Sequence, residues 1–143
     1  MSTDFIPIIG YGTFITHGFW KDKRNVEVCV VKDFIRIFIP KRNWFPYALS
    51  LKNSSFKALK FEVTKRELEE LDIYEGVKSG LFKRVKTEVL LKNDKQIEAF
   101  IYIPTNNTIN SQGLSPDLDK SDSWKKEIEK SSETLKNFPE LLL

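Results

Sequence analysis

The sequence has very few of the residue types that hold metals or build nucleophilic catalytic sites. It contains one cysteine, Cys29, and one histidine, His17, in 143 residues. A zinc site of the usual ligand set needs several such side chains, and a Ser-His-Asp or Cys-His arrangement would have to use His17 alone. We therefore expect catalysis here to use no metal and no cofactor, and to rest on carboxylate acid-base chemistry.

Long apolar runs and targeting signals are also missing. No stretch approaches the roughly 18 apolar residues of a membrane span, and the N-terminus has an early acidic residue but no basic segment of the kind that opens a signal peptide. Cys29 stands alone in the run Val-Glu-Val-Cys-Val-Val, which favours a packed free thiol in a reducing compartment. These features predict a cytoplasmic protein.

Charge of one sign is not concentrated anywhere. The chain has 23 basic and 20 acidic residues, for a net charge of +3, and its densest basic groups are residues 21–24 and 41–42. A solvated face explains these groups better than a phosphate-binding stripe, and neither GxxxxGK[ST] nor GxGxxG occurs. We predict a small-molecule partner and no nucleic acid, although nucleic-acid binding stays open as an alternative hypothesis.

The composition, 41% hydrophobic and 30% charged, is typical of one globular domain spanning residues 1–143. Apolar and β-branched runs predict extended segments at residues 5–9, 26–31, 34–39, 44–51, 56–63, 81–91 and 96–103. Lys32-Asp33 is a turn signal that predicts a hairpin between the second and third runs, and Asn93-Asp94 predicts another between the last two.

Two helices are expected. Thr64 and Glu67 match a capping box, which predicts a helix that ends near Gly76 and carries Glu75 at its C-terminal end. Residues 105–121 are rich in Asn, Ser, Pro and Asp and predict a long surface loop, followed by a helix over about residues 124–137. Together the elements predict an α+β fold with a mixed, barrel-like sheet of about six strands and flanking helices.

A carboxylate alone suffices for one reaction type, in which a substrate's own amine attacks its own amide. Closing the ring of a γ-glutamyl group needs a base for the α-ammonium, donors for the developing oxyanion, and a site that holds the substrate bent. A glutamate desolvated at a helix end has its pKa raised toward neutrality, which suits it to that role. Glu75 is the candidate.

Two separated motifs resemble those of the γ-glutamyl cyclotransferase and γ-glutamylamine cyclotransferase (AIG2-like) superfamily. The first is Ile8-Ile9-Gly10-Tyr11-Gly12-Thr13-Phe14, similar to the strand and YGT/S loop of that family. The second runs from Leu71 to Phe82 and resembles the LDxxEG motif with its following glycine and aromatic residue. The motifs and the stretches between them cover roughly residues 5–103.

The resemblance implies a cyclotransferase that releases 5-oxoproline from a small γ-glutamyl amine or peptide. It also implies that Glu75 is the catalytic carboxylate and that Tyr11, Gly12, Thr13, Phe14 and Phe82 contact the substrate. A glycine lets main-chain N–H groups approach a ligand closely. The string Glu-Gly-Val-Lys-Ser-Gly looks more like cyclotransferases acting on γ-glutamyl amino acids than those acting on γ-glutamyl-lysine.

Some residues leave alternatives open. Phe82 stands where family members commonly have tyrosine, and Ala58 stands where a glycine is frequent, so a non-catalytic binding or regulatory module on the same fold is the second hypothesis. Arg84 is either a paired charge on a strand or a partner for a substrate carboxylate. His17 is a loop residue or lines the cavity mouth. The three tryptophans, Trp20, Trp44 and Trp124, are expected to pack in the core or at the rim.

Overall fold

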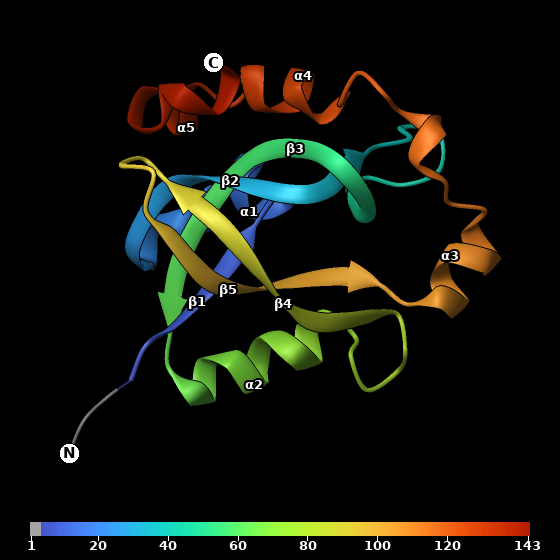
Figure 1. Ribbon diagram of the computed structural model, residues 1–143, viewed down its shortest axis with the longest axis horizontal. Coiled ribbons are helices and arrows are strands. Elements are labelled where there is room, and N and C mark those ends of the chain that lie inside the picture. Colours follow the sequence, from blue (N-terminus) through green and yellow to red (C-terminus); the bar gives the residue numbers. More distant parts are fainter. Residues whose placement is uncertain (1–3) are drawn as a thin grey trace.

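A computed structural model describes residues 4–143, and the first three residues of the predicted domain lie outside it. Within this part of the chain, five strands form a closed barrel in the order β1-β3-β2-β4-β5. Figure 1 shows the barrel in the centre, with α2 beneath it, α4 and α5 above it, and α3 beyond one side. The predicted α+β class with a barrel-like sheet and flanking helices is confirmed.

The strands pair antiparallel except where β1 meets β5 in parallel and closes the barrel. Their bounds are β1 Ile6–Gly10, β2 Arg24–Ile37, β3 Tyr47–Val63, β4 Phe82–Leu91 and β5 Gln96–Pro104. The predicted hairpin at Asn93-Asp94 is confirmed by the β4–β5 pair. The sheet is mixed, as predicted. It has five strands because the predicted segments 26–31 and 34–39 both belong to β2, and the segments 44–51 and 56–63 both belong to β3.

The predicted hairpin at Lys32-Asp33 is wrong, because β2 runs straight through it. Asp33 takes a left-handed conformation (φ 64°), which bends the strand without reversing it. The pairing of β2 with β3 steps from Lys32–Ser55 to Phe34–Ser50, so residues 51–54 bulge from β3. The Asn53 amide donates to Asp33 Oδ1 at 3.0 Å across the bulge. Such bulges increase strand curvature, and both long strands bend with the barrel.

Helix α2 (Lys65–Tyr74) begins with the predicted capping box. Thr64 Oγ1 accepts from the Glu67 amide at 3.2 Å, and Glu67 accepts from the Thr64 amide at 2.8 Å. These bonds and one from Arg24 lower the pKa of Glu67 to about 2. The helix ends where Gly76 takes a φ of 69°, which is the usual role of glycine after a helix. Glu75 is therefore the last residue before the reversal.

The C-terminal region differs from its prediction in two ways. The stretch expected to be a loop contains a short helix, α3 (Asn106–Gln112), which is capped by the Thr105 side chain and by Gly113 with a φ of 62°. A 3₁₀ turn, η2 (Pro116–Leu118), follows it. The single helix expected over residues 124–137 is two helices, α4 (Trp124–Glu129) and α5 (Ser132–Asn137), followed by the 3₁₀ turn η3 (Pro139–Leu142).

The break between α4 and α5 lies beside a contact with an N-terminal helix. It lies at Ser131, whose hydroxyl bonds the Glu127 carbonyl, and Thr134 Oγ1 donates to the Ile15 carbonyl at 2.8 Å. The bend thus brings the segment onto α1 (Thr13–Thr16). Trp124, with 2% of its surface exposed, then packs with Ile15 in an apolar cluster that covers one end of the barrel.

The barrel interior is apolar and includes Cys29, which is 1% exposed. Burial raises the pKa of this thiol to about 12, so it stays a packed thiol, as predicted. None of the helices formed by residues 4–143 has the length and apolar character that a membrane crossing requires.

Candidate active site

A large cavity opens between the turn after β1 and the C-terminal end of α2. Its volume is about 860 Å³, and most of its wall is apolar or aromatic. All six residues that the sequence singled out for the site line this one cavity, namely Tyr11, Gly12, Thr13, Phe14, Glu75 and Phe82. Residues far apart in the sequence therefore meet at this cavity, those of the first motif just after β1 and Glu75 just after α2.

Glu75 is a half-buried carboxylate facing this cavity. Burial raises its pKa to about 7, and no hydrogen bond or charged partner from residues 4–143 contributes to that shift. Burial also raises the pKa of the Tyr11 hydroxyl, and the negative charge of Glu75 raises it further. The carboxylate thus lies close enough to Tyr11 to act on it, and it can exchange a proton near neutral pH.

In the turn after β1, main-chain atoms that no side chain covers form part of the cavity wall. A Cβ atom at Gly10 would overlap the Phe14 ring, and one at Gly12 would lie 2.8 Å from Pro46 Cδ, so neither position has room for a side chain. Within the part of the chain that the structure describes, the amides of Gly12, Thr13 and Phe14 donate to no protein acceptor. They are available to a ligand with an oxygen acceptor.

A network of hydrogen bonds connects the first sequence motif, at Tyr11, to the second, at Asp72. Tyr11 donates its hydroxyl to the Tyr102 carbonyl at 2.7 Å, and Tyr102 donates its own to Asp72 Oδ1 at 2.6 Å. Asp72 also accepts from Arg84 through both oxygens, at 3.0 and 2.8 Å. Because Asp72 lies in the last turn of α2, three residues before Glu75, this network fixes the helix end next to Glu75 relative to the Tyr11 turn.

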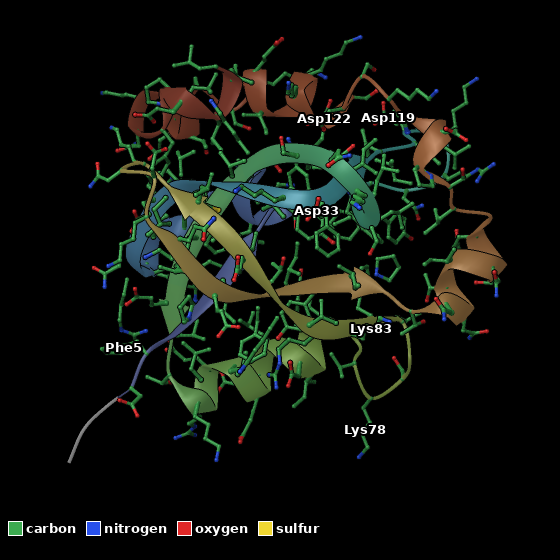
Figure 2. All side chains as sticks on the ribbon, in the orientation of Figure 1. Phe5, Asp33, Lys78, Lys83, Asp119 and Asp122 are labelled. Atoms are coloured by element: carbon green, nitrogen blue, oxygen red, sulfur yellow. The ribbon has the colours of Figure 1, made fainter. Side chains whose placement is uncertain are left out.

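A side chain from the barrel, Arg36, also holds the Tyr11 turn in place. Arg36 on β2 donates to the Tyr11 carbonyl at 2.9 Å. It also forms two 2.8 Å bonds to Asp122, which lies on the segment between η2 and α4 (Figure 2). Arg36 has no exposed side-chain surface, so the C-terminal segment contributes a buried ion pair to the support of the site.

Comparison with known proteins agrees with this geometry. The family model for the γ-glutamyl cyclotransferase, AIG2-like family matches residues 8–126. The chain belongs to this family. The resemblance predicted from the two motifs is therefore confirmed, and the match extends past residue 103 into the C-terminal segment. Comparison with curated proteins gives no match.

Solved structures with the same fold include several of this family. A solution structure from Arabidopsis thaliana has a TM-score of 0.65 at 18% identity and covers 96% of this chain and 90% of that one. A structure named γ-glutamyl cyclotransferase has a TM-score of 0.60 at 15% identity, with 89% and 99% covered. A yeast γ-glutamyl cyclotransferase specific to glutathione has a TM-score of 0.60 at 12% identity, with 96% and 89% covered. At these identities the likeness shows the fold.

The alternatives that the sequence left open have clear positions in this family member. Arg84 is the paired charge on a strand, since it binds Asp72 and lies 4.8 Å from the Phe100 ring centre. His17 is exposed at the end of α1 and stacks against Trp44 at 6.4 Å. Trp124 is in the core and Trp20 is partly buried, whereas Trp44 is 65% exposed at the cavity rim.

Phe82 and Ala58, two of the positions where the resemblance predicts other residues, differ in their relation to the cavity. Phe82 lines it and stacks on Tyr47 with ring centres 5.8 Å apart. Ala58 is fully buried in the barrel core and does not line the cavity. The difference at position 58 is thus a matter of core packing, whereas Phe82 is part of the wall that a substrate would touch.

Several contributors were not predicted from the sequence. Tyr102 and Asp72 form the network behind Glu75, and Phe19 lines the cavity from η1 (Phe19–Asp22). Asp72 lies inside the LDxxEG motif, one helical turn before Glu75, so its position in that motif was an available signal. Phe19 and Tyr102 gave none, because apolar and aromatic residues in a strand or turn are normally attributed to packing.

The network predicts a stability cost for Asp72→Asn. Loss of the charge weakens both Arg84 bonds and the Tyr102 bond, and hydrogen bonds to charged groups contribute about 1.5–3 kcal/mol. We expect the free energy of unfolding in urea to fall by about 1–3 kcal/mol. Asp117→Asn is the matched control, because its 3.7 Å pair with Lys120 is exposed. Equal effects of the two changes would contradict a fixing role for Asp72.

Proposed function

We propose that the chain cyclises the γ-glutamyl group of a small γ-glutamyl amine or peptide and releases 5-oxoproline. The observation that carries this proposal is a carboxylate with a pKa of about 7 in the same cavity as three unused main-chain amides. The family match supports the same chemistry. No metal or cofactor is needed for it, and a cytoplasmic setting stays a prediction from the sequence.

The proposed reaction begins with the substrate's own amine. The Glu75 carboxylate takes a proton from the α-ammonium group, and the freed amine attacks the γ-carbonyl carbon. The carbonyl oxygen becomes an oxyanion, which main-chain N–H groups of the Gly12–Phe14 turn stabilise. When the tetrahedral intermediate collapses, the bond from the γ-carbon to the leaving nitrogen breaks. The Glu75 carboxyl group then returns its proton to that nitrogen, which leaves as an amine. The ring nitrogen, which is positively charged after the attack, passes its second proton to the departing amine, so the products are the neutral lactam 5-oxoproline and an ammonium ion.

The direct test is incubation with γ-glutamyl dipeptides, followed by mass spectrometry for 5-oxoproline. The matched control substrate is the α-linked dipeptide of the same composition, because its leaving amine is not on the γ-carbon. We expect 5-oxoproline from the γ-linked compounds only. Stabilisation of the protein by the γ-linked compounds without any product would support the second hypothesis, a binding module in which Phe82 replaces a needed hydroxyl.

The raised pKa of Glu75 predicts the pH dependence of the reaction. Below pH 7 the carboxyl group is protonated and cannot accept the ammonium proton, so kcat/KM falls about tenfold for each further pH unit. We expect an acid limb with its midpoint at about 7, matching the pKa. Initial rates between pH 5 and 8.5 measure it. A midpoint near 4.5, the ordinary value for glutamate, would contradict the assignment of Glu75 as a desolvated base.

A further inference from the structure

The cavity is larger than a γ-glutamyl group requires. Its volume of about 860 Å³ lies near the upper end of the roughly 300–1,000 Å³ of pockets that hold drug-sized ligands. A γ-glutamyl group placed between Glu75 and the Gly12–Phe14 turn fills only part of this volume. The remaining space is therefore available to the leaving amine, and the side chains that line it determine which amine fits best.

Aromatic side chains form the outer wall. Phe19 is 46% exposed and Trp44 is 65% exposed, although both are large apolar residues. His17 lies against both, parallel to Trp44 at 6.4 Å and edge-on to Phe19 at 5.7 Å. Phe45 meets Trp44 edge-on at 5.2 Å. We call Phe19, Trp44 and Phe45 the aromatic rim. Phe45 packs on Trp44, His17 lies between Trp44 and Phe19, and the rings of Phe19 and Trp44 remain open to solvent.

The same wall carries positive charge. Lys21, Asp22 and Lys23 all line the cavity. The Lys21 ammonium group binds Glu133 at 2.7 Å, outside the cavity lining. Among residues 4–143, Lys23 has only Asp22 as a charged partner, at 3.8 Å, and its side chain is 25% exposed. A pair at that distance makes no hydrogen bond, so the Lys23 ammonium can take a carboxylate from a ligand on the aromatic rim.

On these observations we infer that the preferred leaving group is an aromatic α-amino acid, with its ring on Trp44 and Phe19 and its carboxylate at Lys23. This inference rests on the proposed cyclisation, since it names the substrate class for that same site. Ring-on-ring contacts favour an aromatic group over an aliphatic one of similar polarity. A γ-glutamyl-alanine or a γ-glutamyl-ε-lysine substrate leaves the aromatic rim without a ring partner.

The test compares γ-glutamyl-phenylalanine, γ-glutamyl-alanine and γ-glutamyl-ε-lysine as substrates of the full chain. We expect kcat/KM for the phenylalanine compound to exceed that for the other two by about tenfold or more, the scale that a well-matched apolar contact provides. Trp44→Ala is expected to reduce this ratio to about threefold or less, and Trp44→Phe to restore most of it. Phe5→Ala is the matched control, because Phe5 is 43% exposed and does not line the cavity.

Binding to the Glu75→Gln protein separates this inference from the proposed reaction. Calorimetry with the same three compounds measures preference without turnover. If wild type releases 5-oxoproline equally from all three, the reaction stands and the leaving-group inference is overturned. If no compound yields 5-oxoproline but the phenylalanine compound binds about tenfold more tightly, the aromatic subsite is supported and the proposed reaction fails. If there is neither turnover nor preference in binding, both are overturned.

Discussion

Glu75→Gln is expected to lower kcat for 5-oxoproline release by about 10²–10⁴-fold, the usual contribution of a general acid-base residue. Glutamine has nearly the same shape but can neither accept the α-ammonium proton nor return one to the leaving amine. The measurement is the initial rate at pH 8, where the wild-type carboxylate is ionised. The main-chain donors remain, so substrate affinity is expected to change much less than kcat. A variant that folds and retains full activity would contradict the mechanism.

The same substitution is expected to leave the fold intact and to stabilise it at high pH. The folded pKa of Glu75 is raised from 4.5 to about 7, so the folded state holds its proton more tightly than the unfolded state does. Below pH 4.5 both states are protonated and the group has no effect. Between pH 4.5 and 7 the wild type loses stability, by about 3 kcal/mol in total at 1.36 kcal/mol per pKa unit.

Urea unfolding of the two proteins at pH 4.5 and pH 8 measures that effect. Because all other groups titrate alike in both proteins, the difference in unfolding free energy isolates Glu75. We expect the advantage of the glutamine variant to grow by about 3 kcal/mol over this range. A difference that does not change with pH would show that the carboxylate is not desolvated. Residues at catalytic sites commonly carry such a stability cost.

Arg36→Leu is expected to be the most destabilising single change outside the cavity. It would leave the Asp122 carboxylate, which is 14% exposed, and the Tyr11 carbonyl without their 2.8–2.9 Å partners. Breaking a buried ion pair on one side costs about 3–5 kcal/mol. We expect the free energy of unfolding to fall by that amount, together with a loss of activity because the Tyr11 turn is no longer fixed.

Two further variants make this result specific. Lys130→Met breaks the exposed Lys130–Glu127 pair and is expected to cost no more than about 1 kcal/mol. Arg36→Leu combined with Asp122→Leu removes both charges and is expected to recover part of the stability, because no unpaired carboxylate remains. An Arg36→Leu cost as small as that of Lys130→Met would contradict the supporting role of the buried pair.

Local signals predicted the parts of the fold that depend on neighbouring residues. The Thr64–Glu67 capping box and Gly76 fixed both ends of α2, and so placed Glu75 at the helix end. The turn residues Asn93-Asp94 predicted the β4–β5 hairpin. In each case the residues that decide the structure lie within a few positions of one another.

The errors arose where a local signal has two tertiary outcomes. Asp33 and Asn53 are turn formers, but the structure uses their left-handed conformations for a bulge within two paired strands. A strand register is set by the whole sheet, which a short window does not contain. Ser131 likewise interrupts a continuous helical pattern because α5 bends to bond α1.

In the candidate site, too, residues within a local motif could be predicted, whereas contacts between distant residues could not. Motif residues identified one side chain from each wall, Tyr11 and Glu75, since each has a characteristic spacing of glycines around it. The Tyr102–Asp72 bond joins residues 30 positions apart, and the aromatic rim depends on the contact that brings Trp44 against His17 from a distant part of the sequence. Their residue types are common in cores, so no pattern separated a rim from ordinary packing.

The protonation of Glu75 itself is the most direct test of the account. Titration of its side-chain carboxyl carbon by ¹³C NMR, with the Glu75→Gln spectrum for assignment, gives the pKa in the ligand-free protein. We predict a midpoint at about 7. A midpoint near 4.5 would mean a solvated carboxylate with no special basicity, and would contradict its assignment as the proton acceptor in the cavity.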